Sequence, residues 1–120
     1  SASGGARMQE GIVSLMQMAK TVSGVNRVME KNIPYISVIT HPTTRGVSAS
    51  FSNVADIIIA EPNALFCFSG PRIVKQTMKK EIPRDFGLSE RNMTNGQIDM
   101  ITDRKNMKET LSKILRLFGE

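Results

Sequence analysis

Two short segments of this chain place glycine and hydroxyl residues directly ahead of stretches that can form helices. The first is SASGGAR at residues 1–7, and the second is THPTTRGV at residues 40–47. Because glycine lacks a side chain, the N–H groups of Gly4, Gly5 and Gly46 can approach a ligand closely, and a following helix adds positive potential. Each loop alone is either an oxyanion site or a simple turn. Their repetition favours a site for charge developing on a carbonyl oxygen.

Side chains that usually carry acid–base or nucleophilic catalysis are scarce. His41 is the single histidine, and no nucleophile or second histidine is placed near it, so a hydrogen-bonding role in a loop is favoured over a general base. Cys67 is the single cysteine and lies within FCFS, which favours a core thiol over a reactive one. The remaining acidic candidates are separated along the chain, as expected for turns or surface: Asp56, Glu61, Asp99 and Asp103.

Composition bounds the class of protein. A chain of 120 residues with 40% hydrophobic residues predicts one domain with a packed core. The net charge of +5 favours anionic partners, whereas 5% aromatic residues without tryptophan make nucleic acid an unexpected partner. A lone cysteine excludes an internal disulfide and fits a reducing compartment such as the cytoplasm. No apolar run is long enough for a membrane span, so no membrane association is expected.

Apolar periodicity predicts the first elements. Spacing of three and four residues predicts a helix from near Ala6 to just before residue 31, along which Met8, Met16 and Met18 are expected to pack. A β-branched run predicts a strand at 35–40, and small residues at 47–51 predict a short helix. Apolar runs at 57–60 and 65–68, separated by a turn, predict paired strands.

The second half continues the alternation. Pro71 predicts a helix to about Met78, followed by a charged loop at 79–87 and a helical turn at 90–94. A short strand at 98–101 precedes a closing helix, which Asn106 is expected to cap. This order predicts an α/β or α+β domain with a mixed sheet.

Four segments then identify a resemblance to a known family: SASGGARMQEGIVSLMQMAK, YISVITHPTTRGVSASF, ADIIIAEPNALFCFSGPRIVKQT and GQIDMI. They closely resemble the carboxyltransferase β subunits of bacterial and plastid acetyl-CoA carboxylases, and the likeness runs from Ser1 to the end. The resemblance implies an α/β fold of the crotonase (ClpP/crotonase-like) type, a spiral of ββα turns, with 1–120 as the carboxyl-terminal part of the domain. The family's zinc ribbon and the first half of its crotonase domain are not in this chain, so we expect a fragment or processed piece that holds no metal.

The resemblance also implies an activity. The family transfers the carboxyl group of carboxybiotin, carried on biotin carboxyl carrier protein, to acetyl-CoA, and the product malonyl-CoA enters fatty acid synthesis. The β subunit acts with a homologous α subunit in the cytoplasm or plastid stroma. Exposed apolar surface is expected to drive this assembly. Backbone amides rather than titrating side chains hold the enolate oxygen, which agrees with the scarcity of catalytic side chains.

Position by position, the resemblance assigns backbone oxyanion donors to Gly4, Gly5, Arg45 and Gly46. It assigns ligand-binding positions to Ser3, Ala6, Arg7, Thr44 and Val47.

The chain departs from the family pattern at several places. Arg45 stands where a glycine pair is usual, and its side chain would either crowd the acyl pocket or meet a phosphate or the carboxyl being transferred. Ala55 and Cys67 replace glycines, and Lys75 replaces an acid. Four basic residues either attract the phosphates of coenzyme A or form a solvated face: Lys20, Lys31, Arg72 and Lys75.

These departures keep two alternatives open. One is an inactive paralogue or fragment that binds and assembles without turnover. The other is a biotin-independent crotonase-type enzyme acting on an acyl-CoA, although the carboxylates that a hydratase needs are not evident.

Overall fold

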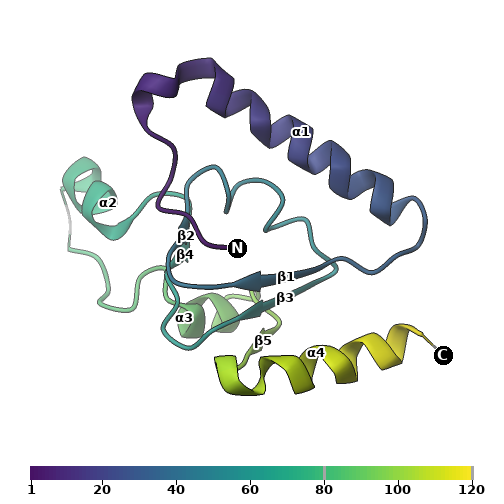
Figure 1. The fold of residues 1–120 in the computed structure, drawn as a ribbon. Helices are drawn as coiled ribbons and strands as arrows, with labels where there is room; N and C mark the ends of the chain where they lie inside the picture. Colours follow the sequence, from purple (N-terminus) through teal and green to yellow (C-terminus); the bar gives the residue numbers. More distant parts are fainter. Residues whose placement is uncertain (80, 120) are drawn as a thin grey trace.

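The computed structural model describes residues 1–79 and 81–119 (Figure 1). Lys80 and Glu120, which fall in the predicted loop 79–87 and in the predicted domain 1–120, lie outside the described residues. The helices are η1 (Met8–Glu10), α1 (Gly11–Met29), α2 (Pro71–Met78), α3 (Ser89–Thr94) and α4 (Arg104–Phe118). The strands are β1 (Ile36–Ile39), β2 (Thr43–Thr44), β3 (Ile57–Ala60), β4 (Phe66–Cys67) and β5 (Met100–Ile101).

The strands form two parallel ladders. A three-stranded sheet has the order β1-β3-β5, and a two-stranded sheet pairs β2 with β4. The expected mixed sheet is wrong, since every ladder in the described residues is parallel and the antiparallel pairing there is an isolated bridge between Leu65 and Leu88. Each paired strand is reached by a long crossover segment, which is what parallel pairing requires.

The apolar runs at 57–60 and 65–68 do form strands, but they do not pair with each other. The turn between them, closed by the Ala64 N–H donating to the Glu61 carbonyl at 3.2 Å, leads β4 away from β3 and beside β2. The residues of the two runs still share one core with their neighbours. That core consists of Ile39, Ile58, Ala60, Ala64, Phe66 and Ile98, with Ala55 packed against it.

Helix α1 begins later than its apolar pattern predicted. Arg7 is extended with ψ 145°, and Gly11 has φ 56°, so a single 3₁₀ turn precedes α1. Its amino-terminal apolar side chains are exposed, with Met8 91% and Met16 57% accessible, so the expected packing of these two methionines is wrong in this structure. Only Val25 of α1 is buried. Figure 1 shows α1 at the top of the view, with the segment between β2 and β3 drawn between it and strands β1 and β3.

Two other local expectations are wrong. Residues 47–51 form consecutive hydrogen-bonded turns instead of a helix, because the Ser50 N–H donates to the Val47 carbonyl rather than continuing a helical ladder. The closing helix is preceded by Asp103 rather than Asn106, and neither side chain makes a capping hydrogen bond. In the described residues no helix combines the length and apolarity needed to cross a membrane.

An ion pair fixes the start of α4 against the end of β3. The Arg104 guanidinium donates to both oxygens of the Glu61 carboxylate, at 2.5 Å from Nε to Oε1 and 2.9 Å from Nη2 to Oε2. This bidentate geometry favours the ionised carboxylate. The hydrogen bond from Arg104 lowers the pKa of Glu61 below its usual value.

We predict that Arg104→Gln destabilises the fold at neutral pH and that the difference from the unchanged chain disappears in acid. A lowered pKa in the folded state adds stability that is present above the unfolded pKa and is lost as pH falls through the folded pKa. Urea unfolding between pH 3 and pH 7 measures this, with Arg116→Gln on the same helix as the control. A difference that stays constant down to pH 3 would contradict the assignment.

Candidate active site

The two glycine-containing loops lie side by side. The Ser3 N–H donates to the Pro42 carbonyl at 2.7 Å, and the Thr44 N–H donates to the Ser3 carbonyl at 2.8 Å. These bonds form a parallel bridge between Ser3 and Thr43. The Thr44 hydroxyl adds a bond to the Ser3 carbonyl at 3.1 Å. The two loops lie some forty residues apart in the sequence, and the sequence alone predicts them as separate loops. In the structure they are hydrogen-bonded to each other.

Some backbone N–H groups near this bridge already donate to an acceptor in the protein, and others do not. The Arg45 N–H is shared between the carbonyls of Cys67 at 3.2 Å and Phe68 at 3.0 Å, so it is not available to a ligand. The Gly5 N–H donates to the Ser3 hydroxyl at 3.0 Å. Among the described residues, the N–H groups of Gly4 and Gly46 have no acceptor. A free donor thus remains on each loop.

The expected helix dipoles do not reach both loops directly. Ala6 and Arg7 separate Gly5 from η1, and the second loop runs into turns instead of a helix. Within those turns the Ala49 N–H donates to the Arg45 carbonyl at 3.0 Å, which is a single helical-type bond. The N–H of Val47 also has no acceptor among the described residues, as at the first turn of a helix. Local backbone donors, rather than a long helix, supply the positive potential here.

Serine hydroxyls hold the carbonyl side of the second loop. Ser48 donates to the carbonyls of Arg45 at 2.8 Å and Cys67 at 3.0 Å, and Ser50 donates to the carbonyl of Gly46 at 2.5 Å. Both serines are buried. These bonds satisfy the carbonyls of Arg45, Gly46 and Cys67 within the fold. Sequence reasoning missed these two residues, although the alternation of serine at 48, 50 and 52 was a usable signal.

Of the glycines at the bridge, Gly5 is required by a close contact, whereas a Cβ on Gly4 would meet no atom within 4 Å. Gly5 has φ 100°, and a Cβ built on it would lie 1.8 Å from Cδ of Arg45. The Arg45 side chain therefore crosses the face of Gly5. A Cβ on Gly46 would lie 3.2 Å from Sδ of Met18, so α1 packs on the second loop through this methionine. Of the methionines predicted to pack, Met18 is the one that does so here.

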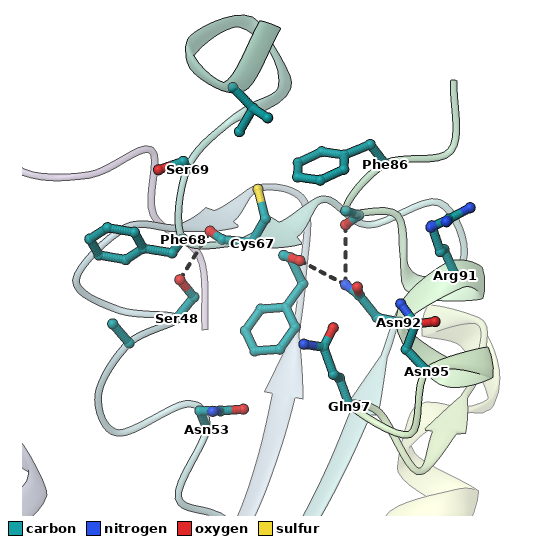
Figure 2. A pocket seen from close by; sticks show the side chains of 14 residues that line it. Ser48, Asn53, Cys67, Phe68, Ser69, Phe86, Arg91, Asn92, Asn95 and Gln97 are labelled. Atoms are coloured by element: carbon teal, nitrogen blue, oxygen red, sulfur yellow. Dashed lines mark hydrogen bonds between the residues drawn. The ribbon is translucent and has the colours of Figure 1, made fainter. Parts of the chain in front are cut away.

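A pocket of about 530 Å³ adjoins the second loop (Figure 2). Ser48 and Ala49 form one wall, and another is formed by Cys67 at the end of β4 with Phe68 and Ser69 directly after it. The opposite side is amide-rich, with Asn92, Asn95 and Gln97 near Arg91, while Asn53 lies on the Ser48 side. Figure 2 shows the Cys67 thiol pointing away from the Asn92 side. Apolar surface with a few polar groups is typical of a site for a small molecule.

The pocket walls are rigidly supported. The buried Asn92 amide donates to the carbonyls of Phe66 at 2.7 Å and Gly87 at 3.2 Å, which fixes α3 to β4. Burial raises the pKa of the Cys67 thiol, so the thiol rather than the thiolate is present at neutral pH. Cys67 is half-buried and lies at the pocket wall rather than in the core.

The other predicted candidates have ordinary roles. His41 accepts a hydrogen bond from the Leu65 N–H at 3.2 Å through Nδ1, as expected for a loop histidine. Arg7 lies near Glu10 at 3.7 Å, and Lys75 near Glu81 at 3.9 Å, both exposed pairs. Within residues 1–79 and 81–119, no cluster of three or more His, Cys, Asp or Glu side chains could hold a metal ion.

Arg45 has φ 59°, a left-handed conformation that costs a residue with a Cβ about 1–2 kcal/mol. We predict that Arg45→Gly is more stable than Arg45→Ala by about 1 kcal/mol, since both lose the contact with Gly5 but only glycine relieves the backbone. Urea unfolding of the two variants measures the difference. Equal stabilities, or a more stable alanine variant, would show that the left-handed backbone is not strained.

Comparisons with known proteins identify the family of this chain. Residues 1–119 match the model of the carboxyl transferase domain. The chain is 57% identical over 116 residues to acetyl-coenzyme A carboxylase carboxyl transferase subunit beta 1 of Lachnospira eligens, covering 97% of this chain and 45% of that protein. It is 57% identical over 117 residues to subunit beta of Clostridioides difficile, covering 98% of this chain and 41% of that protein. The chain thus spans less than half the length of these relatives.

A solved structure shows the same fold. A transcarboxylase 12S structure, with methylmalonyl-coenzyme A and methylmalonic acid bound, superposes with a TM-score of 0.76 at 29% identity and covers 94% of this chain and 22% of that chain. The α/β, crotonase-type fold predicted from the sequence is confirmed, as is the resemblance that predicted it. Over residues 1–119, the chain belongs to the carboxyl transferase domain family.

Proposed function

We propose that this chain contributes the thioester side of a biotin-dependent carboxyltransferase, in which a carboxyl group is transferred to acetyl-CoA to give malonyl-CoA. The observation that carries the proposal is the pair of free N–H groups on adjacent loops, at Gly4 and Gly46. The turns that follow Gly46 contribute Ser48 and Ala49 to the wall of a pocket of about 530 Å³. Relatives at 54–57% identity are carboxyl transferase β subunits of acetyl-coenzyme A carboxylase, which supports the same reaction.

In this proposal the residues of the chain stabilise negative charge on the thioester oxygen and do not transfer protons. When the α-carbon of a thioester is deprotonated, negative charge moves to the carbonyl oxygen, and N–H donors aimed at that oxygen stabilise the enolate. A single donor of this kind contributes about 3–4 kcal/mol of transition-state stabilisation in other enzymes. The donors proposed here are Gly4 and Gly46, with Gly5 available if its bond to the Ser3 hydroxyl is released. The occupied Arg45 N–H is left out of this set.

The ligand-facing roles of the flanking residues follow from their contacts. Ser3 and Thr44 hold the loops together, and Val47 adds a further free N–H. Ala6 and Arg7 form the extended link to η1. Carboxybiotin on a carrier protein would supply the carboxyl group, and a carboxyltransferase α subunit would supply the opposite side of the site. The exposed apolar side chains of η1 and α1, led by Met8 and Ile12, are proposed as part of the surface that assembles with such a subunit. The proposed location is the cytoplasm or the plastid stroma.

The test is reconstitution. The chain mixed with a carboxyltransferase α subunit is expected to decarboxylate malonyl-CoA in a reaction that depends on added biocytin. Gly46→Ala is expected to lower kcat/KM about ten- to a hundredfold, because the new Cβ pushes the loop away from Met18 and misplaces its N–H group. Met18→Ala in the same chain is expected to restore part of the loss.

Gly24→Ala is the matched control, since a Cβ on Gly24 of α1 meets no atom within 4 Å. Its activity is expected to equal that of the unchanged chain. A mixture whose rate does not exceed that of the α subunit alone would remove the proposed function. Equal losses in Gly46→Ala and Gly24→Ala would remove the role of the second loop.

A further inference from the structure

Arg45 is a charged side chain that the bridge between the loops holds in an unusual place. Its guanidinium makes no hydrogen bond or ion pair with any residue in the part of the chain that the structure describes. Three arginines have carboxylate partners in the described residues, Arg7 with Glu10, Arg91 with Asp85 and Arg104 with Glu61, whereas Arg45 is among those without one. The Arg45 guanidinium and the N–H groups of Gly4 and Gly46 are therefore hydrogen-bond donors on adjoining loops that have no acceptor in the described residues.

The backbone of Arg45 is held on both sides. Its N–H is shared between two carbonyls of the segment after β4, and its carbonyl accepts from the Ser48 hydroxyl at 2.8 Å and the Ala49 N–H at 3.0 Å. With φ at 59° and these bonds in place, the direction in which the side chain leaves the loop is fixed. The side chain is therefore positioned by the fold although its end is exposed.

That direction leads across the first loop. Around the position that a Cβ of Gly5 would occupy, Cδ of Arg45 lies at 1.8 Å, Nε at 2.7 Å and Cγ at 2.9 Å. The methylene groups thus cover Gly5, and the guanidinium follows directly beyond them. The cation lies at the junction of the two loops whose free N–H groups are proposed to bind the thioester oxygen.

We propose that Arg45 is a specificity-determining residue, whose guanidinium binds a carboxylate on the acyl group of the thioester. This inference rests on the proposed function, because the thioester oxygen is placed at the same loops. A planar guanidinium matches a carboxylate with two parallel hydrogen bonds, and it does so better than a lysine ammonium. In a malonyl thioester the carboxylate is separated from the thioester carbonyl by a single methylene group, which fits the adjacency of Arg45 to Gly5.

A phosphate of coenzyme A is the other anion that Arg45 could meet. The phosphates lie at the opposite end of the pantetheine arm from the thioester, so they are far from the oxygen held at these loops. The two anions predict different results, because acetyl-CoA and malonyl-CoA share every phosphate and differ in the acyl carboxylate. Discrimination between these two thioesters therefore identifies the group that Arg45 binds.

The experiment measures the Kd of the full chain for malonyl-CoA and for acetyl-CoA by titration calorimetry. Arg45→Met keeps the length of the stem and removes the charge. It is expected to weaken malonyl-CoA binding about ten- to a hundredfold and to change acetyl-CoA binding less than about threefold. The unchanged chain is expected to bind malonyl-CoA more tightly than acetyl-CoA, and Arg45→Lys is expected to retain part of this preference, since it keeps the charge without the planar guanidinium. It also serves as the second variant if the methionine variant does not fold.

Arg116→Met on α4 is the control for net charge, and it is expected to leave the ratio of the two Kd values unchanged. Equal weakening of both thioesters in Arg45→Met, no change in either, or no thioester binding by the unchanged chain would each overturn the inference. If the unchanged chain shows the predicted preference but the reconstituted mixture transfers no carboxyl group, the proposed function fails while the role of Arg45 stands.

Discussion

The parallel bridge between Ser3 and Thr43 is the constraint on which the rest of the site depends. Two backbone bonds, from the Ser3 N–H to Pro42 and from the Thr44 N–H to Ser3, join the amino-terminal segment to the strand that leads into Arg45. Strand β2 is in turn paired with β4, so the first loop is tied to the pocket wall through β2. Without this bridge the chain would carry two unrelated glycine loops. With it, the free N–H groups of Gly4 and Gly46 lie on adjoining loops, as the proposed site requires.

Near that bridge most backbone carbonyls accept hydrogen bonds, whereas some backbone N–H groups have no acceptor. These free N–H groups are the ones available to a ligand. Buried carbonyls find donors, as the bonds from Ser48 and Ser50 show, because an unpaired buried polar group costs about 1–3 kcal/mol. Donors near the surface are left free, since water or a ligand can satisfy them. Arg45, whose N–H is occupied by the carbonyls of Cys67 and Phe68, is proposed to contribute its side chain instead of its backbone. Glycine and arginine therefore have complementary parts in the same loop.

Much of the fold was readable from the sequence because its strands and helices carry strong local signals. The β-branched run of β1, the proline that starts α2 and the turn residues after α3 each specify a local conformation. The pairing of the strands could not be predicted, because β3 and β4 are adjacent in sequence but belong to different sheets. Parallel pairing depends on segments that are distant in the sequence. The exposure of Met8 and Met16 was also hidden, since periodicity shows that a helix has an apolar face without showing what covers it.

The candidate site divides in the same way. The resemblance identified the two glycine loops by residue, whereas their contact, the shared Arg45 N–H and the serines behind the loop needed coordinates. The path of the Arg45 side chain across Gly5 could not be predicted, because the resemblance placed a glycine at that position and said nothing of where a longer side chain would go.

Amide hydrogen exchange of the chain, followed residue by residue, tests the bridge and its free donors most directly. The amides of Ser3, Thr44 and Arg45 donate to backbone carbonyls and are predicted to exchange slowly, whereas those of Gly4 and Gly46 are predicted to exchange fast. Fast exchange at Ser3 and Thr44, or strong protection at Gly4 and Gly46, would show that the loops are not joined as described or that their donors are already occupied.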